Sequence, residues 1–120
     1  MNEVVITGLG FVSPIGQSAV EVLDHLRAVR SGISLWSAKG FTKTFPAGIV
    51  HGDFDDHFEK KDLPYLDRVT KMSVAAAEQA LADAGLPPGL GEPGPRAGVF
   101  AGTVSGGAET QTQWLRDFSA

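Results

Sequence analysis

Residues 4–16 read VVITGLGFVSPIG, a run of apolar and β-branched residues that passes directly into a turn spaced by glycines. An uninterrupted β-branched run is typical of a strand covered on both faces, as in a parallel sheet. Glycines allow a tight exit from such a strand, where side chains would obstruct a close approach of the backbone. The stretch therefore predicts a buried strand over residues 3–7, followed by a turn that can approach a ligand or a catalytic group.

A helix is predicted directly after this turn. Ser18 and Glu21 have the spacing of a capping box, in which each side chain accepts from the backbone N–H of the other residue. Val22 and Leu26 fall on one apolar stripe of the helix that follows. The pattern predicts a helix to about residue 29, stopped by Gly32.

The middle of the chain predicts shorter elements. Residues 33–45 have no clear period and are interpreted as an ordered loop, residues 47–50 as a short strand and residues 55–60 as a short helical piece. A long helix rich in small residues is predicted over residues 65–84, with Pro64 in its first turn and Gly85 and Pro87 at its end.

The last third predicts a linker, a strand and a helix. Residues 87–95 are rich in proline and glycine and indicate a linker, after which residues 97–102 predict a second buried strand. An amphipathic helix bearing Trp114 and Phe118 follows Gly106-Gly107. Strands that alternate with helices indicate the α/β class.

Composition bounds the function. At 120 residues the chain is one domain's worth, and it contains no cysteine, so it has neither disulfides nor thiol chemistry of its own. A net charge of −4 argues against a nucleic-acid surface, which needs a concentrated basic face. We find no signal peptide and no apolar run near the roughly 20 residues that span a bilayer, so a cytoplasmic protein without a membrane span is expected.

The glycine turn could also belong to a dinucleotide-binding fingerprint. That motif needs a third glycine where this chain has Ser13, and an acidic residue at the end of a second strand about 20 residues later. Asp24 lies instead in a segment with helical spacing. The dinucleotide interpretation therefore stays a remote alternative.

Four blocks in order resemble the β-ketoacyl-acyl-carrier-protein synthases. They are Thr7-Gly8-Leu9-Gly10 with Val12-Ser13-Pro14 and Gly16, then Ser31-Gly32-Ile33, then Leu66-Asp67-Arg68 before the alanine-rich helix, and finally Arg96–Thr103 before Gly106-Gly107. The resemblance covers essentially the whole chain. It implies that residues 1–120 are the N-terminal segment of the first half of a thiolase-like fold, layered α/β/α/β/α and incomplete within this chain, with the small-residue helix near the core and the subunit interface.

The resemblance also implies a reaction. Such enzymes condense an acyl thioester with malonyl carrier protein in fatty acid or polyketide elongation, using a cysteine thiolate and two histidines. No matching catalytic residue is present in this chain, because it has no cysteine and His25, His51 and His57 lie outside the family's histidine motifs. The chain alone is therefore expected to be inactive. No cofactor is expected to bind permanently, since phosphopantetheine arrives on the carrier protein.

The resemblance suggests two sets of site residues. Thr103, Ser105, Gly106 and Gly107 correspond to a loop that borders the acyl pocket. Lys60 and Lys61, with Arg68 nearby, form a local basic cluster in an acidic chain and correspond to positions that help to dock the acidic carrier protein. Expected partners are the acyl carrier protein and the remainder of the synthase or a complementary subunit, in a homodimer or heterodimer.

A metal site is considered and set aside. His51, Asp53, Asp55, Asp56, His57 and Glu59 are ligand types, but Phe58 stands where a calcium loop needs glycine, and no bidentate glutamate closes the loop. This segment is interpreted as a solvated acidic loop.

Three further alternatives concern the class of protein. The chain could begin a condensing enzyme, begin an inactive partner subunit of the chain-length-factor kind, or be one part of a split synthase. In each case we expect residues 8–16 and 102–107 to turn out of adjacent buried strands toward one cavity.

Overall fold

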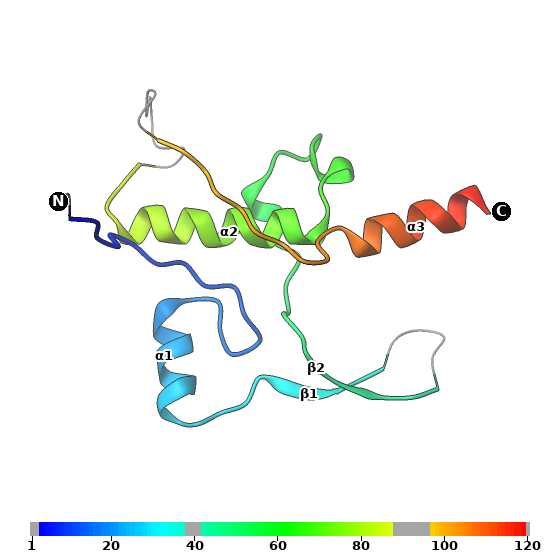
Figure 1. Ribbon diagram of the computed structural model, residues 1–120, viewed down its shortest axis with the longest axis horizontal. Helices are drawn as coiled ribbons and strands as arrows, with labels where there is room; N and C mark the ends of the chain where they lie inside the picture. Colours follow the sequence, from blue (N-terminus) through cyan, green and yellow to red (C-terminus); the bar gives the residue numbers. More distant parts are fainter. Residues whose placement is uncertain (1–2, 38–41, 88–96, 120) are drawn as a thin grey trace.

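The computed structural model describes residues 3–37, 42–87 and 97–119. Within these ranges the helices are α1 (Ala19–Arg27), α2 (Arg68–Asp83) and α3 (Ala108–Phe118), the strands are β1 (Ile33–Trp36) and β2 (Phe45–Gly48), and the 3₁₀ turns are η1 (Asp55–His57) and η2 (Leu63–Tyr65). Figure 1 shows α2 near the middle, with α1 and the β1–β2 hairpin on one side and α3 projecting toward the C-terminus. The predicted linker over residues 87–95 lies, apart from Pro87, outside the described residues.

The start of α1 confirms the predicted cap. The Ser18 hydroxyl accepts from the Glu21 backbone N–H at 3.2 Å. Glu21 completes the box one residue early, because its carboxylate accepts from the Gln17 N–H at 2.8 Å rather than from Ser18. Asp24 lies inside α1 and not at the end of a strand, as its helical spacing indicated.

The end of α1 differs from the prediction. The helix stops at Arg27, two residues early, and Val29 takes a left-handed φ of 53°. Gly32 is not the stop, because the helix already ends at Arg27. An added Cβ on Gly32 would lie 2.7–2.8 Å from atoms of Pro14 and Ile15, so glycine lets these two residues pack closely against it.

The loop predicted over residues 33–45 is wrong at both ends, where β1 and the start of β2 form a hairpin, and its residues 38–41 lie outside the described residues. β1 pairs antiparallel with β2, with Ile33 opposite Gly48 and Trp36 opposite Phe45. The strand predicted at residues 47–50 begins earlier and keeps only Ala47 and Gly48 in β2. A four-residue strand is too short to show a period, so its pairing partner rather than its own pattern defines it.

The helix predicted over residues 65–84 is α2, but it begins later. Pro64 lies in the separate turn η2, and Asp67 caps α2 by accepting from the Thr70 backbone N–H at 2.8 Å. At the other end, Gly85 has a φ of +69°, as a helix-terminating glycine requires. The small residues predicted for this helix allow residues 8–11 to pack closely on it.

Residues 8–11 lie directly on α2. The Leu9 N–H donates to Asp83 Oδ2 at 2.9 Å, and the Phe11 N–H donates to Gln79 Oε1 at 3.1 Å. A Cβ on Gly10 would lie 1.8 Å from the Ala76 carbonyl oxygen. Glycine is required at position 10 because the backbone there is in direct contact with the backbone of α2.

The prediction of two buried strands is wrong in this structure. Residues 3–7 and 97–102 have no strand assignment, and Val4 and Phe100 are 92% and 100% exposed. A buried strand needs a neighbour on each side, and the described residues offer none. The α/β class is therefore present only in part, as helices with one hairpin.

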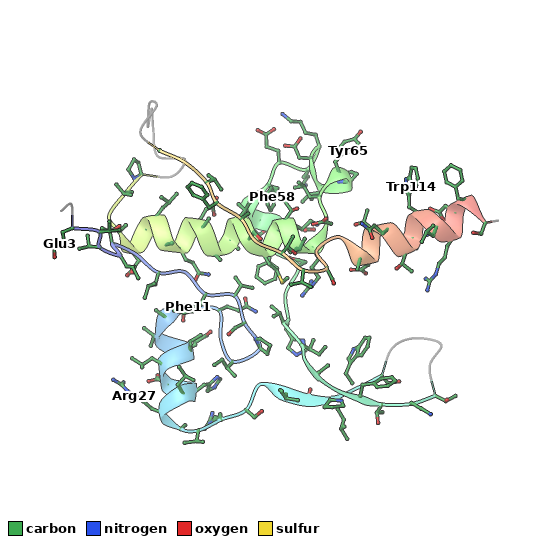
Figure 2. All side chains as sticks on the ribbon, viewed as in Figure 1. Glu3, Phe11, Arg27, Phe58, Tyr65 and Trp114 are labelled. Atoms are coloured by element: carbon green, nitrogen blue, oxygen red, sulfur yellow. The ribbon has the colours of Figure 1, made fainter. Side chains whose placement is uncertain are left out.

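The described chain has a thin core. Val22 and Ala75 are its only buried apolar residues, and large side chains stand clear of the ribbon, as Figure 2 shows for Trp114. The accessible surface is 10176 Å², whereas a compact monomer of this size exposes about 6,200 Å². The radius of gyration is 17.6 Å, against about 13.6 Å for a compact domain of equal length.

Candidate functional site

The predicted pocket loop lies against the first turn of α2. The Thr103 hydroxyl accepts from the Gly106 N–H at 2.9 Å and closes the loop. A Cβ on Gly106 would meet Val69 Cγ1 at 3.0 Å, and one on Gly107 would meet Asp67 Oδ2 at 3.2 Å. Glycine at both positions lets the loop lie this close to α2 without displacing the Val69 and Asp67 side chains.

Asp67 connects this loop to the helix start. Its carboxylate accepts from the Thr70 backbone N–H, and this hydrogen bond, helped by the Thr70 side chain, lowers the pKa of Asp67 from its ordinary 3.8. Asp67 is therefore ionised at neutral pH, which suits both the helix cap and the positive end of the helix dipole.

An apolar groove of about 500 Å³ runs between α2 and residues 99–103. α2 contributes Val69, Val74 and Ala77, and the extended segment contributes Val99 and Thr103. Of the four residues predicted to line an acyl pocket, Thr103 lines this groove, whereas Ser105, Gly106 and Gly107 shape the turn that follows. Alkyl side chains and small residues make the groove suited to an apolar ligand.

The two glycine turns do not converge on one cavity. Ser13, Ile15 and Gly16 line a separate hollow of about 440 Å³. Gly8 and Gly10 meet α2 at Ala76–Ala84, whereas Gly106 and Gly107 meet it at Asp67 and Val69. At about 1.5 Å per residue this separates the contacts by roughly 10–25 Å along the helix. The prediction of a shared cavity is wrong here, because neither turn leaves a paired strand.

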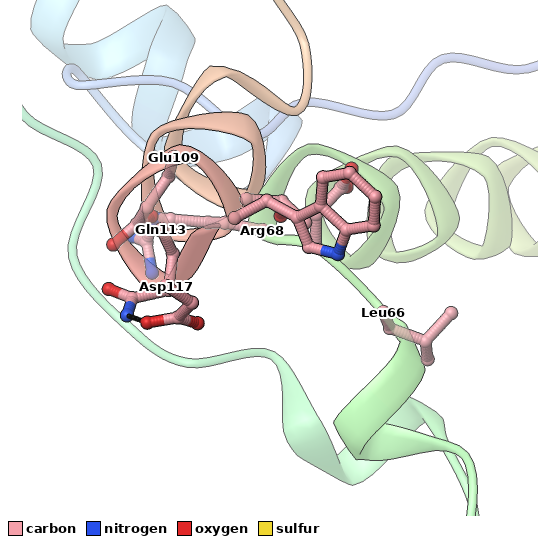
Figure 3. A pocket seen from close by; sticks show the side chains of 8 residues that line it. Leu66, Arg68, Glu109, Gln113 and Asp117 are labelled. Atoms are coloured by element: carbon pink, nitrogen blue, oxygen red, sulfur yellow. Dashed lines mark hydrogen bonds between the residues drawn. The ribbon is translucent and has the colours of Figure 1, made fainter. Parts of the chain in front are cut away.

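A second hollow lies between α3 and the start of α2. It measures about 360 Å³ and is lined by Leu66, Asp67 and Arg68 on one side and by α3 on the other. Figure 3 shows Gln113 and Asp117 joined by a hydrogen bond of 2.8 Å on its α3 wall. On the same helix the Trp114 and Phe118 rings lie 5.0 Å apart, with Trp114 66% exposed.

The two predicted docking lysines occupy the tip of a tight turn. The Asp62 N–H donates to the Glu59 carbonyl oxygen at 2.9 Å, which makes Lys60 and Lys61 the central residues. Lys61 pairs with Glu59 at 2.7 Å, and both side chains are 72% exposed. Both lysines are exposed, as the docking prediction requires.

Arg68 is also exposed, but unlike the two lysines its side chain is bound to backbone carbonyls. Its guanidinium donates to the carbonyl oxygens of Gly52 at 2.8 Å and Val50 at 2.6 Å, and it lies 5.8 Å from the centre of the Phe54 ring. Sequence reasoning placed Arg68 with the lysines by charge alone. Its partners are backbone carbonyls, which have no sequence signature.

Two further contacts hold residues 55–57 to α2, and neither was predicted from the sequence. Lys71 Nζ lies 2.6 Å from Asp55 Oδ1, and the Lys71 side chain is only 16% exposed. His57 Nδ1 lies 2.5 Å from Glu78 Oε2. In the sequence, these contacts are indicated only by charges of opposite sign on residues 55–59 and on α2.

The His25 side chain has a backbone partner: its Nδ1 lies against the Ile15 carbonyl oxygen. At His51 it is the backbone carbonyl that accepts, from the Gln17 side-chain amide at 2.5 Å. In the part of the chain that the structure describes, no three His, Cys, Asp or Glu side chains are grouped to hold a metal ion. No described helix is long and apolar enough to cross a membrane.

Comparisons with known proteins identify the family. The family described as "Beta-ketoacyl synthase, N-terminal domain" matches residues 1–119. The chain is 36% identical over 113 residues to 3-oxoacyl-[acyl-carrier-protein] synthase 1 of Escherichia coli (strain K12), covering 92% of this chain and 28% of that protein. It is 36% identical over 118 residues to the granaticin polyketide putative beta-ketoacyl synthase 1 of Streptomyces violaceoruber, covering 95% and 28%.

A third relative is a named beta subunit. The tetracenomycin polyketide synthase ketoacyl synthase beta subunit of Streptomyces glaucescens is 38% identical over 88 residues, covering 71% of this chain and 22% of that protein. No solved structure matches. The chain thus spans about a quarter of the length of the curated relatives. Because the family match extends over nearly every residue, the chain belongs to the beta-ketoacyl synthases and corresponds to their N-terminal domain.

Proposed function

We propose that this chain is the N-terminal part of a β-ketoacyl-acyl-carrier-protein synthase, an acyltransferase of fatty acid or polyketide elongation. The family match over residues 1–119 is the observation that carries the proposal. The names of relatives from both kinds of pathway support it.

The chemistry requires residues beyond this chain. An acyl group passes from the carrier's phosphopantetheine thiol to a cysteine thiolate, malonyl carrier protein then loses CO2, and the resulting carbanion attacks the thioester. This releases the thiolate and leaves a β-ketoacyl group two carbons longer on the carrier. The chain contains no cysteine, so the nucleophile has to come from the rest of the protein.

We assign the groove beside Thr103 to one wall of the acyl pocket. Val69, Val74, Ala77 and Val99 offer alkyl surface to an acyl chain. Ser105, Gly106 and Gly107 would hold the following turn on α2 and so set the position of that wall. The rest of the protein would supply the strand neighbours that residues 3–7 and 97–102 lack.

Assembly and location complete the proposal. The partners are the acyl carrier protein and a second synthase subunit in a homodimer or heterodimer, and the site of action is the cytoplasm. These assignments depend on the resemblance, on the acyl carrier protein in the name of one relative and on the beta subunit in the name of another.

A second candidate is an inactive partner subunit. The match to a protein named a beta subunit favours it. The residue at the cysteine position of the complete coding sequence separates the two candidates: cysteine indicates an enzyme, and glutamine indicates a partner subunit. A stop codon directly after residue 120 would indicate a split synthase.

The test is a condensation assay with the complete protein that contains this chain. Acyl and malonyl carrier proteins are supplied, and the carrier-bound product is measured by mass spectrometry. We expect a β-ketoacyl product two carbons longer, abolished by iodoacetamide, which must act outside this cysteine-free chain. Activity only with an added synthase subunit would indicate the partner role. NADH binding without condensation would restore the dinucleotide interpretation.

Reversing the charge of Lys60 and Lys61 tests the docking assignment. Lys60→Glu with Lys61→Glu is expected to raise the KM for acyl carrier protein about tenfold or more with kcat unchanged, because like charges then face an acidic partner. The matched control, Lys43→Glu, changes an exposed lysine on the turn before β2 and should leave KM unaltered.

Glu59→Gln should act in the opposite direction. It removes the carboxylate that pairs with Lys61 at 2.7 Å, so KM should fall slightly or stay the same. Equal KM values for the wild type and the double reversal would refute the docking assignment.

A further inference from the structure

The turn that carries Lys60 and Lys61 is fixed at both ends on one helix. On its C-terminal side, hydrogen bonds from Tyr65 to Asp62 and from Leu66 to Leu63 lead directly into the start of α2. On its N-terminal side, residues 50–57 are held to α2 by side chains. We call residues 50–57 the anchored loop.

Three residues of α2 form these anchors. Arg68 binds the Val50 and Gly52 carbonyls, Lys71 binds Asp55, and Glu78 binds His57. His57 lies only two residues before Glu59, where the lysine turn begins. The anchors therefore set where the two ammonium groups stand relative to α2.

Arg68 and Lys71 differ from ordinary surface cations. Lys71 is 16% exposed, and its ammonium group points at Asp55. Arg68 uses two nitrogens of its planar fork on two different carbonyls while its guanidinium lies over the Phe54 ring. Arg68 is exposed and Lys71 is not, but both cations already bind groups of the anchored loop, although both lie close in sequence to the docking lysines.

We propose that Arg68 and Lys71 are positioning residues for carrier binding: they fix the anchored loop on α2 and thereby hold Lys60 and Lys61 in a docking geometry. This inference rests on the docking role proposed above. Their contribution is geometric and not electrostatic. Pre-organising the lysines reduces the ordering cost of binding.

The geometry makes a specific demand on Arg68. A lysine at this position keeps the positive charge but has one compact ammonium group, which cannot reproduce a planar fork shared between two carbonyls. A positioning role therefore predicts that Arg68→Lys fails like Arg68→Gln. A direct contact with the carrier predicts that Arg68→Lys works nearly as well as the wild type.

The experiment measures steady-state kinetics of the complete protein with acyl carrier protein and with an acyl-pantetheine thioester that lacks the carrier. Arg68→Gln and Arg68→Lys are each expected to raise the KM for the carrier substrate about three- to tenfold. The kcat values and the KM for the carrier-free thioester should stay at wild-type values. Lys43→Gln is the control for loss of one positive charge.

Lys71 is tested by a cycle with its partner. Lys71→Met and Asp55→Asn should each raise the carrier KM, and the double variant should be no worse than either single one, because both remove the same anchor. The salt dependence of KM gives a second readout. It should become shallower when Lys60 and Lys61 are neutralised and stay unchanged for Arg68→Lys.

The outcomes distinguish a wrong positioning role from a wrong docking assignment. Wild-type KM for Arg68→Lys with a raised KM for Arg68→Gln would overturn the positioning role, as would a parallel rise of KM for the carrier-free thioester. If neutralising Lys60 and Lys61 leaves KM unchanged, the docking assignment itself is wrong. If those lysine variants raise KM while the Arg68 and Lys71 variants do not, only the positioning proposal is wrong.

Discussion

Gly10→Ala is expected to release the N-terminal segment from α2. The new methyl group would lie 1.8 Å from the Ala76 carbonyl oxygen and 2.9 Å from the Ala80 nitrogen, and helix backbone cannot yield without losing its own hydrogen bonds. Moving residues 8–11 away also breaks the Leu9 and Phe11 hydrogen bonds to Asp83 and Gln79. We expect a loss of about 3 kcal/mol or more in the free energy of unfolding.

Urea denaturation of the complete protein measures this loss. Lys43→Ala is the control, because Lys43 is an exposed residue on the turn before β2. Its free energy of unfolding should stay within about 0.5 kcal/mol of the wild type. Equal stability of the two alanine variants would show that the segment does not pack on α2 as described.

The 120-residue chain on its own is expected not to unfold cooperatively. It exposes 10176 Å², about 4,000 Å² more than a compact monomer of its size, and its unpaired segments present apolar side chains to water. Hydrophobic burial from two buried residues cannot offset the conformational entropy of ordering the chain. The isolated chain should bind ANS strongly, aggregate on heating and give a broad calorimetric trace.

The complementary measurement adds the rest of the protein as a separate chain. Sharp unfolding and loss of ANS binding should appear only in the mixture. A sharp thermal transition of the 120-residue chain alone, as a monomer, would contradict this expectation.

Local signals in the sequence predicted the helices well. Ser18 and Glu21 mark the start of α1, Gly85 marks the end of α2, and Gly106-Gly107 precedes α3. Each signal depends on residues within one turn of the feature that it predicts. Such features can therefore be predicted without knowing which distant parts of the chain lie beside them.

Sheet formation was predicted poorly because it depends on distant partners. The β-branched run at residues 4–6 has the composition of a buried strand, yet its backbone finds no strand neighbour among the described residues. β1 was missed for the opposite reason, since only its pairing with β2 makes Ile33–Trp36 a strand. Composition indicates what a segment can form, and the available neighbours decide what it does form.

For the candidate site, too, some residues could be predicted from the sequence and others could not. Lys60 and Lys61 were predicted from the resemblance, and their docking role stays a prediction. Asp67 was named only within the block before the long helix, and its role as the cap of α2 was not predicted. Arg68 was grouped with those lysines by its charge, whereas the structure uses it on two backbone carbonyls. A side chain that binds backbone leaves no complementary residue in the sequence from which its partner could be found.

The exposed apolar segments have a consequence during synthesis. An N-terminal domain leaves the ribosome first, and translation proceeds at about 5–20 residues per second. In the proposed complete protein, Val4, Val99, Phe100 and their neighbours would then face solvent for many seconds before later parts of the chain emerge. A chaperone that covers nascent hydrophobic chain would protect this domain, and the speed of translation beyond it would set how long that protection is needed.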